Sequence, residues 1–292
     1  MLAPRERVEY SPVTDRARIT WPNGERVALW IAPNIEHYEY LPEEGLGRDP
    51  WFRRVPHPDV LNYSIRDYGN RIGVWRMIDA LDQYETPCTV SLNTAVLEHF
   101  PEIAAAIKAR PWTIMSHGIY NTRYLTSVSE EDERCFYQDT IDTVLRHTGF
   151  RLRGMLGPAI TGTLQTPDLM AEAGLTYHCD WVHDDEPVPI RVKQGRLISV
   201  PYTFEINDSP FFRGSHTGEY FAEIACRQFD RLYEEGKDSG RVMSIALHPY
   251  LIGQPHTIRH LRVILAHIAA HDGVWWTTAD DIADYYFENY YA

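Results

Sequence analysis

The chain has few cysteines, and their spacing excludes the usual cysteine-built scaffolds. Its four cysteines, Cys88, Cys135, Cys179 and Cys226, are far apart and form no CxxC pair. A structural zinc site or a disulfide framework needs closely spaced pairs, so neither is supported. We therefore expect reduced cysteines, with Cys88 and Cys179 inside strands of the core.

Long apolar runs and clusters of positive charge are also missing. No apolar stretch approaches the roughly 20 residues that span a bilayer, and the first ten residues lack the apolar segment of a signal peptide. The formal net charge is −13. Because nucleic acids and anionic membranes attract a clustered positive field, the sequence predicts a cytoplasmic protein that binds neither of them.

A glycine-rich nucleotide-binding turn is the third feature that the sequence lacks. The first apolar run, Val27–Ala32, is followed by the residues PNIEH, with no GxGxxG or Walker sequence. A doubly wound nucleotide-binding sheet usually carries such a turn after its first strand. Of the two common α/β architectures, the sequence therefore favours a (β/α) barrel.

What is present is an ordinary globular composition with alternating strand and helix patterns. The 292 residues are 44% hydrophobic and 24% charged, which allows a sizeable core. Short apolar runs alternate with segments that repeat apolar residues at the i, i+3, i+4, i+7 spacing of a buried helix face. No linker or repeat divides the chain, so we expect one domain over residues 1–292. The expected strands include Val27–Ala32, Thr89–Leu92, Thr113–Met115, Thr176–Cys179, Ser199–Val200 and Ser244–Leu247.

One irregular stretch interrupts this alternation. Residues 34–68 are rich in proline, tyrosine and acidic residues and show no periodicity. Loops this long inside a domain are usually functional. We expect this loop to cover the active-site mouth as a lid or substrate wall.

Polar side chains follow most of the expected strands. Glu36 comes after the first, His117 after the third and His248 after the seventh. The carboxyl ends of barrel strands and their loops build the active site, so this arrangement predicts an enzyme. One carboxylate and two histidines suit either a divalent metal or shared general acid and base roles, and their spacing does not choose between these. The other histidines, including His178, His267 and His271, are expected to be surface or loop residues.

Several short stretches together resemble the polysaccharide deacetylase (NodB-homology) superfamily. More narrowly, they resemble the branch with metal-independent allantoinases, bacterial cyclic imide hydrolases and a peptidoglycan-deacetylase-like protein. The resemblance covers residues 20–285, and the stretch DYGNRIGVWR is its most specific part. The stretches are Val27–Glu36, Asp67–Arg76, Ser116–Gly118, Gly157–Ala159 and Leu247–Pro249.

The resemblance implies a fold, an activity class and an assembly. Members have a distorted (β/α) barrel with about seven strands, a variant of the closed barrel. They hydrolyse amide carbon–nitrogen bonds other than peptide bonds. Relatives form tetramers, so the resemblance also implies a homo-oligomer.

The chain departs from the usual metal-dependent pattern of that superfamily in two places. The pattern has an aspartate pair after the first strand and a His-x-x-x-His after the third. Here Asn34 and Glu36 stand where the acidic pair would be, and Asn121 stands four residues after His117. An amide offers a metal only a neutral oxygen and cannot act as a general base. We therefore favour chemistry without a cofactor, and a zinc-like divalent ion held by Glu36 and His117 is the alternative.

The function that these features favour is hydrolytic opening of a small cyclic amide or imide. One alternative is a metal-dependent polysaccharide or N-acetyl-sugar deacetylase, and another is an inactive barrel that binds a sugar or other small ligand. The stretch 183–186 is an acidic loop, and Asp185 is the residue in it that we expect to reach the cleft. The expected catalytic residues are Glu36, His117 and His248, and the expected substrate-binding residues are Asn34, Tyr120, Asn121, Pro158 and Asp185.

Overall fold

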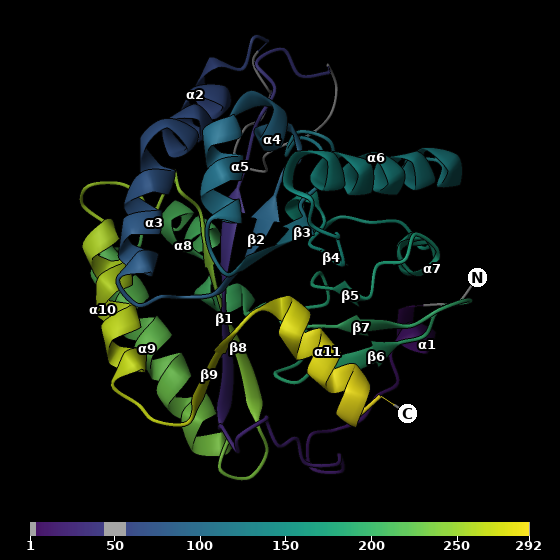
Figure 1. The fold of residues 1–292 in the computed structure, drawn as a ribbon, viewed down its shortest axis with the longest axis vertical. Helices are drawn as coiled ribbons and strands as arrows, with labels where there is room; N and C mark the ends of the chain where they lie inside the picture. The colour runs from purple at the N-terminus through teal and green to yellow at the C-terminus, as the bar shows by residue number, and fades with distance from the viewer. Residues whose placement is uncertain (1–3, 44–56, 292) are drawn as a thin grey trace.

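The computed structural model describes residues 4–43 and 57–291, and within them nine strands form one sheet with helices packed on its outer face (Figure 1). The strand order is β6-β7-β5-β4-β3-β2-β1-β8, with β9 paired to the first half of β1. All pairs are parallel except the antiparallel pair of β6 and β7. The strands are β1 Val27–Ile35, β2 Cys88–Leu92, β3 Trp112–Ser116, β4 Gly154–Met155, β5 Tyr177–His178, β6 Val188–Ile190, β7 Leu197–Ser199, β8 Arg241–Leu247 and β9 Val274–Thr277.

The helices follow most of the strands, as the alternating pattern predicts. Ser129 and Thr278 are N-caps whose side chains accept hydrogen bonds from Asp132 N and Asp281 N. None of the helices in the described residues is both long enough and apolar enough to cross a membrane. The helices are α1 Pro4–Arg7, α2 Val60–Tyr68, the π-helix η1 Gly69–Gly73, α3 Val74–Asp82, α4 Ala95–His99, α5 Pro101–Lys108, α6 Glu130–Thr148, the 3₁₀ turn η2 Pro158–Ile160, α7 Thr166–Glu172, the 3₁₀ turn η3 Phe204–Ile206, α8 Asp208–Arg213, α9 Gly218–Glu235, α10 Ile258–Ala269 and α11 Ala279–Asn289.

Side chains of β1 alternate between two buried layers. Val27, Leu29 and Ile31 pack in the large cluster between the sheet and its helices. Ala28 and Trp30 belong to a second cluster on the concave side of the sheet, together with residues from β3, β5 and β8. Because successive side chains of a strand point to opposite faces, the residues at even numbers of β1 line the barrel interior.

The barrel is distorted because regular strand pairing does not close it. After β7, residues 200–207 run beside β8 as an irregular segment instead of forming a strand. Thr203 N donates to Ser244 Oγ and Ser244 N donates to Thr203 Oγ1, while Asn207 forms an isolated bridge with Ala246. The expected distorted (β/α) barrel is confirmed.

The number of strands exceeds the expected seven. Each of β4 and β5 has only two residues, and β6 is a short strand at the edge of the sheet with a proline at its centre. Strands this short leave little apolar alternation in a sequence, so pattern reading undercounts them.

The long irregular stretch is shorter than the expected 34–68. Asn34 and Ile35 still belong to β1, and residues 60–68 form α2, whose N-cap Asp59 accepts a hydrogen bond from Asn62 N. The middle of the stretch, residues 44–56, lies outside the described residues. The role of this stretch as a cover for the site stays a prediction.

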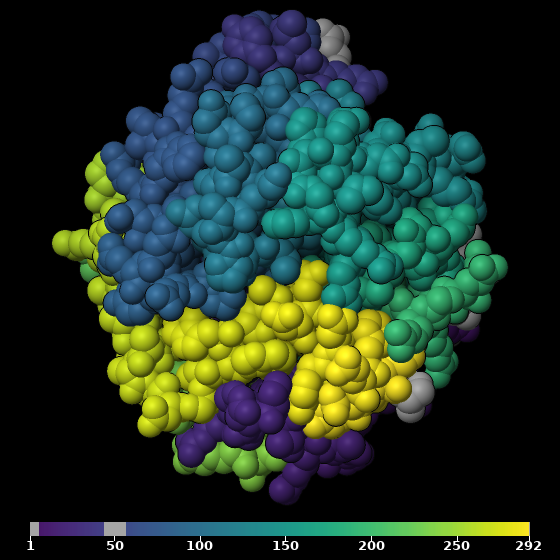
Figure 2. All heavy atoms as spheres, viewed as in Figure 1, coloured from purple at the N-terminus to yellow at the C-terminus, as the bar shows by residue number. Residues whose placement is uncertain are grey.

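The aromatic C-terminal segment packs against the chain's own N-terminal segment (Figure 2). Tyr285 Oη and Tyr290 Oη donate to the carbonyl of Thr20, and the ring centre of Tyr285 lies 5.7 Å from that of Trp21. These contacts place α11 across the amino end of the barrel (Figure 1). The aromatic residues of this tail therefore make contacts within the chain. The expected homo-oligomer, a tetramer in relatives, stays a prediction.

The glycines of the Asp67–Arg76 stretch let η1 lie directly on the loop that follows β8. A Cβ added at Gly73 would lie 2.0 Å from the carbonyl oxygen of Pro249, and one at Gly69 would lie 3.0 Å from Tyr250 N. Both neighbours are backbone atoms, which cannot move aside as a side chain can. The stretch therefore fixes the position of the loop that begins with His248.

Gly73→Ala is expected to destabilise the protein by about 3 kcal/mol, because the new methyl group must displace the backbone of Pro249. Urea unfolding would measure this change. The control is Ile72→Ala in the same turn, where the side chain is 41% exposed and its loss leaves the packing intact. Equal stability of Gly73→Ala and the wild type would show that η1 does not support the loop.

Candidate active site

Glu36, His117 and His248 converge at the carboxyl end of the sheet. Glu36 Oε1 lies 3.3 Å from His248 Nε2 and 3.7 Å from His117 Nε2. All three follow their strands in the register that faces the barrel interior, since β1 and β8 pair with Pro33 opposite Leu247. Their exposed fractions are only 4–5%. The structure therefore brings the three expected catalytic residues into one buried cluster.

Asp208 is a fourth member of this cluster. Its Oδ1 lies 2.6 Å from His248 Nδ1, and its carboxylate also accepts backbone N–H groups of His248 and Ile252. Asp208 is the first residue of α8, and the N-cap of this helix is Asn207. Complete burial raises the pKa of Asp208, although His248 and these hydrogen bonds oppose the rise. A buried carboxylate at Nδ1 fixes the orientation of the His248 ring.

The carboxylates of Asp208 and Glu36 determine the charge of His248. Burial alone would lower the pKa of this histidine, but the charges of Asp208 and Glu36, with the hydrogen bonds that they accept, raise it to about 9. His248 is therefore an imidazolium at neutral pH, with Nε2–H directed at Glu36. A cationic acid with its proton aimed into the site is suited to protonate a leaving group.

Glu36 is ionised although it is buried. Burial would raise its pKa, but the charge of His248, hydrogen bonds from the two histidines and the charge of Arg66 hold the pKa well below the usual range. Arg66 Nε lies 3.5 Å from Glu36 Oε2. Glu36 is thus a carboxylate with cationic groups on two sides.

Arg66 is a buried cation that the sequence reading did not single out. It is 2% exposed, and its guanidinium carbon lies 3.9 Å from the ring centre of Tyr38 and 4.5 Å from that of Tyr250. Its NH1 and NH2 groups donate to Asn62 Oδ1 and Tyr38 Oη. Aromatic faces and oxygen acceptors together hold the guanidinium in one position beside Glu36.

Two asparagines fix the backbone around these side chains. Asn93 Oδ1 accepts the N–H of His37 at 2.9 Å, and its Nδ2 donates to the carbonyl of His117. Asn70 Nδ2 donates to the carbonyl of Glu36 at 2.9 Å. The turn after β1 is therefore tied to the turn after β3 and to η1. Asn93 follows β2 and Asn70 lies in the specific DYGNRIGVWR stretch, so both carried a sequence signal.

One hydrogen bond fixes the orientation of the His117 ring. His117 Nδ1 lies 2.9 Å from the carbonyl oxygen of Leu156, which can only accept, so Nδ1 carries a hydrogen and Nε2 faces Glu36. The next residue, Gly118, has φ 78°, and a Cβ there would lie 2.5 Å from Pro158 Cγ. Pro158 therefore packs directly beside the His117 turn, as expected for a residue of the site wall.

The turn at Pro158 is held by Asp180, which in turn contacts the buried His178. Asp180 Oδ1 accepts the N–H of Gly157 at 2.7 Å, and Asp180 Oδ2 lies 3.0 Å from His178 Nε2. The turn has φ 53° at Ala159 and 54° at Ile160, which non-glycine residues rarely adopt. The expectation that His178 is a surface or loop residue is wrong, because it is buried in β5 beside Met155, in the layer between the sheet and its helices.

The other expected substrate-binding residues lie at different depths. Asn34 Nδ2 donates to the carbonyl of Ala32 and to Tyr202 Oη inside the barrel. Asn121 Nδ2 donates to Tyr38 Oη at 3.4 Å, and its Oδ1 has no hydrogen-bond partner in the described part of the chain. Tyr38 therefore links Asn121 to Arg66, and Tyr202 links Asn34 to Asn207, the N-cap of α8.

Tyr120 belongs to an outer pocket next to the cluster. Its Oη lies 3.3 Å from His99 Nε2, and the pocket, with a volume of about 430 Å³, also includes His37 and Tyr63. Burial and the nearby His99 lower the pKa of His37 to about 4, so His37 is neutral. Aromatic rings and the neutral imidazole of His37 line the pocket together with the charged side chains of Glu39, Asp67 and Arg71, so it offers a flat ligand both aromatic surface and polar partners.

Asp185 lies at the opposite end of the barrel. Its carbonyl accepts the N–H of Val242, near the start of β8, whereas His248 follows the end of that strand. Six residues of extended strand separate the two ends by about 20 Å. The expectation that Asp185 reaches the cleft is wrong, because its loop packs at the amino end, where Arg16 pairs with the neighbouring Asp184.

The donor set does not fit a tightly held metal ion. Within the described residues, Glu36, His117 and His248 do not form a group whose ligand atoms all lie within 4.8 Å of one another. The charges of Asp208 and Glu36 also favour the protonated form of His248, which has no lone pair at Nε2. Asn34 offers only an amide. Glu36 Oε1 and His117 Nε2 remain, 3.7 Å apart. A catalytic zinc ion usually has three protein ligands, one more than these two residues supply.

Comparison with known proteins finds a family whose model matches part of this chain. Residues 61–178 match the family model described as polysaccharide deacetylase. A putative polysaccharide deacetylase of Schizosaccharomyces pombe is 27% identical over 297 residues, which cover 90% of this chain and 91% of that protein.

Two solved structures share the fold over almost the whole chain. A probable polysaccharide deacetylase from Pseudomonas aeruginosa PAO1 has a TM-score of 0.82 and 28% identity, covering 94% of this chain and 96% of that one. PuuE allantoinase has a TM-score of 0.85 and 27% identity, covering 100% of both chains. The expected resemblance is confirmed.

Proposed function

We propose that this chain, a hydrolase of the polysaccharide deacetylase superfamily, opens a small cyclic amide or imide without a metal ion. The family match and the allantoinase neighbour support hydrolysis of a carbon–nitrogen bond outside peptides. The site chemistry supports the narrower substrate class.

The observation that carries the proposal is the pairing of a buried imidazolium with a buried carboxylate. His248 is held protonated by Asp208 and faces Glu36, which is ionised. An acid and a base with opposite charge states at one place can transfer two protons in one reaction. Hydrolysis of an amide needs both transfers, one from water and one to the leaving nitrogen.

The reaction proceeds in two steps in this proposal. Glu36 accepts a proton from water as the oxygen attacks a ring carbonyl, and the carbonyl electron pair moves onto its oxygen. Asn121 Nδ2 and the backbone N–H of Ala159 in the turn at Pro158 stabilise that oxyanion, an effect typically worth about 3 kcal/mol per donor. The pair then returns, the carbon–nitrogen bond breaks, and His248 Nε2–H protonates the nitrogen. Water has been added across the bond, giving a ring-opened carboxylic acid.

A cyclic imide suits this donor set better than an acetamide. The imide nitrogen leaves as an anion stabilised by its second carbonyl, so the reaction needs less help from a Lewis acid. The low exposure of Glu36, His117 and His248, 4–5%, also favours a small ring over a polymer strand. The outer pocket beside His37 offers aromatic surface to a flat ring.

Deacetylation of an N-acetyl sugar is the second candidate, because the matching family model and the two deacetylase relatives carry that name. That reaction would use the same amide-cleaving groups on an acyclic amide. A metal ion would be expected to supply the extra electrophilic activation.

The test is turnover of a panel of cyclic imides, hydantoins and allantoin, followed by ultraviolet absorbance, with and without prolonged chelation. We expect opening of at least one ring at a rate that chelation does not change. Loss of turnover that zinc restores would overturn the metal-free mechanism. Release of acetate from N-acetylglucosamine oligomers without any ring opening would establish the deacetylase. Saturable binding without turnover would establish an inactive ligand-binding barrel.

Turnover of the best ring is expected to fall tenfold per pH unit above about pH 9, because the reaction uses the protonated form of His248, whose pKa is raised to about 9. A profile of kcat/KM from pH 6 to 10.5 would measure this decline. A decline centred near pH 6.5, the ordinary histidine value, would show that His248 is not the acid.

A further inference from the structure

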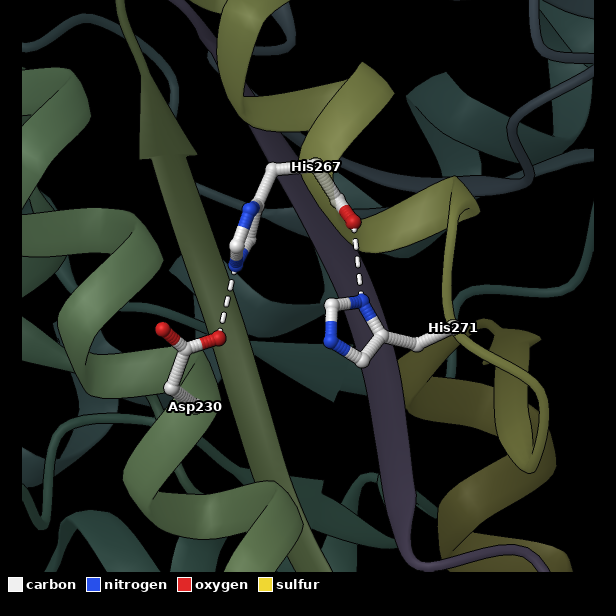
Figure 3. A group of neighbouring side chains, drawn as sticks. All are labelled: Asp230, His267 and His271. Atoms are coloured by element: carbon white, nitrogen blue, oxygen red, sulfur yellow. Dashed lines mark hydrogen bonds and ion pairs between the residues drawn. The ribbon is translucent and has the colours of Figure 1, made fainter.

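A second cluster of metal-binding side chains lies on the outer face of the barrel, between two helices. Asp230 comes from α9, His267 from α10 and His271 from the turn just after α10 (Figure 3). Their ligand-type atoms all lie within 4.8 Å of one another. Within residues 4–43 and 57–291, no other group of three or more histidine, cysteine or acidic side chains meets this distance.

One hydrogen bond of the cluster holds His271 through Nδ1, and another joins His267 to Asp230. His271 Nδ1 lies 2.9 Å from the carbonyl oxygen of His267, so Nδ1 carries the hydrogen and Nε2 the lone pair. His267 Nε2 lies 2.7 Å from Asp230 Oδ1. Metal-binding histidines are commonly held in this way, with the second ring nitrogen donating to a backbone carbonyl.

Aromatic packing limits rotation of the His271 ring. Its centre lies 5.1 Å from the rings of both Phe229 and Tyr233, and Phe229 is completely buried. Tyr233 Oη donates to the carbonyl of Asp272, the next residue. The turn after α10 is therefore tied to α9 on both sides of His271, which preorganises its free nitrogen.

An ordinary ion pair explains only part of this arrangement. It accounts for Asp230 and His267, which are 53% and 33% exposed, but it gives His271 Nε2 no role. Ligand atoms around a tetrahedral ion with bonds of about 2.1 Å lie about 3.4 Å apart. No pair of ligand atoms needs to close by more than about 1.4 Å to reach this spacing, a movement that exposed side chains allow.

We propose that Asp230, His267 and His271 bind a divalent ion of the zinc and nickel class. Two imidazole nitrogens and one carboxylate oxygen suit such ions, and the strongly negative chain attracts cations. The bound ion links α9 to the turn after α10 and stabilises their packing. It replaces the Nε2 hydrogen of His267, which leaves as a proton.

This site is separate from the candidate active site. Strand β9 begins three residues after His271 and pairs with Val27, at the amino end of β1. Nine residues of extended strand lie between Val27 and Glu36, which is about 30 Å. The inference therefore stands whether or not the proposed ring opening is correct.

The experiment is a titration of chelator-treated protein with zinc chloride by calorimetry and by thermal unfolding. We expect one zinc ion per chain and a rise in unfolding temperature of about 5 °C at a hundredfold excess over Kd. His271→Ala and Asp230→Asn are expected to weaken binding at least tenfold. His256→Ala, which removes an exposed histidine outside the cluster, is the matched control and is expected to bind like the wild type.

Unchanged zinc affinity in the His267→Ala/His271→Ala double variant would overturn the proposal, as would absence of binding at 100 µM zinc. Binding that survives in that variant but is lost in Glu36→Gln would place the ion in the active site. Anomalous scattering at the zinc edge would locate the ion directly, with a peak between α9 and α10 as the supporting result.

Discussion

Glu36→Gln is expected to lower kcat/KM for ring opening by about 10³-fold, because the amide cannot take a proton from water. The substitution keeps the shape of the side chain, so KM should change little. It also removes one of the two carboxylates that raise the pKa of His248, which places the alkaline decline at lower pH. Steady-state kinetics on the ring that the wild type turns over fastest would measure both effects.

The control for Glu36→Gln is Glu98→Gln, which removes an exposed carboxylate paired with Arg146. It is expected to keep wild-type activity. Thermal unfolding of both variants would separate loss of chemistry from loss of folding. If Glu36→Gln retained more than a tenth of the wild-type kcat/KM while folded, a different group would have to accept the proton, and His117 would be the next residue to replace.

Asp208→Asn is expected to lower kcat about 10²-fold at pH 8 and to move the alkaline decline down by at least about one pH unit. Asp208 does not touch the substrate in the proposed reaction and acts as a positioning residue for His248. Its charge raises the pKa of His248, so its removal lowers that pKa and leaves fewer molecules with the acid protonated at pH 8. The loss should shrink below pH 6, where His248 is protonated in the variant as well.

Asp280→Asn is the matched control for this prediction. Asp280 is a buried carboxylate whose pKa burial raises, and it accepts hydrogen bonds from Thr113 and Tyr177 at the amino end of the barrel. Its replacement is expected to cost stability without moving the pH profile. A profile for Asp208→Asn that matches the wild type would contradict the proposed role of Asp208, even if activity had fallen.

The candidate site was predictable from sequence where its residues follow strong strands. Glu36, His117 and His248 come directly after β1, β3 and β8, and parallel strands bring their carboxyl ends together. Asp185 was misplaced because β6, β7 and the loop before them are too short and irregular to show which end of the barrel a residue reaches.

The residues around Glu36, His117 and His248 were harder to predict from sequence. Arg66 reaches Glu36 because α2 and η1 fold back over the end of the barrel, where Gly69 and Gly73 pack on the Pro249 and Tyr250 backbone. The charge of His248 depends on Asp208, 40 residues away in sequence. Distances of this kind set pKa values, and no pattern of residue types contains them.

The sequence by itself determined the alternation of strands and helices, the interior-facing register of Glu36 and His248 and the departure of Asn34 and Asn121 from a metal-binding pattern. These follow from local periodicity and from residue type, which are properties of the chain alone. Only the tertiary structure decided that His248 is a cation, that Asp185 lies away from the site and that His267 and His271 meet Asp230. Each of these depends on burial or on contacts between distant segments, because charge and coordination are set by what surrounds a group in space.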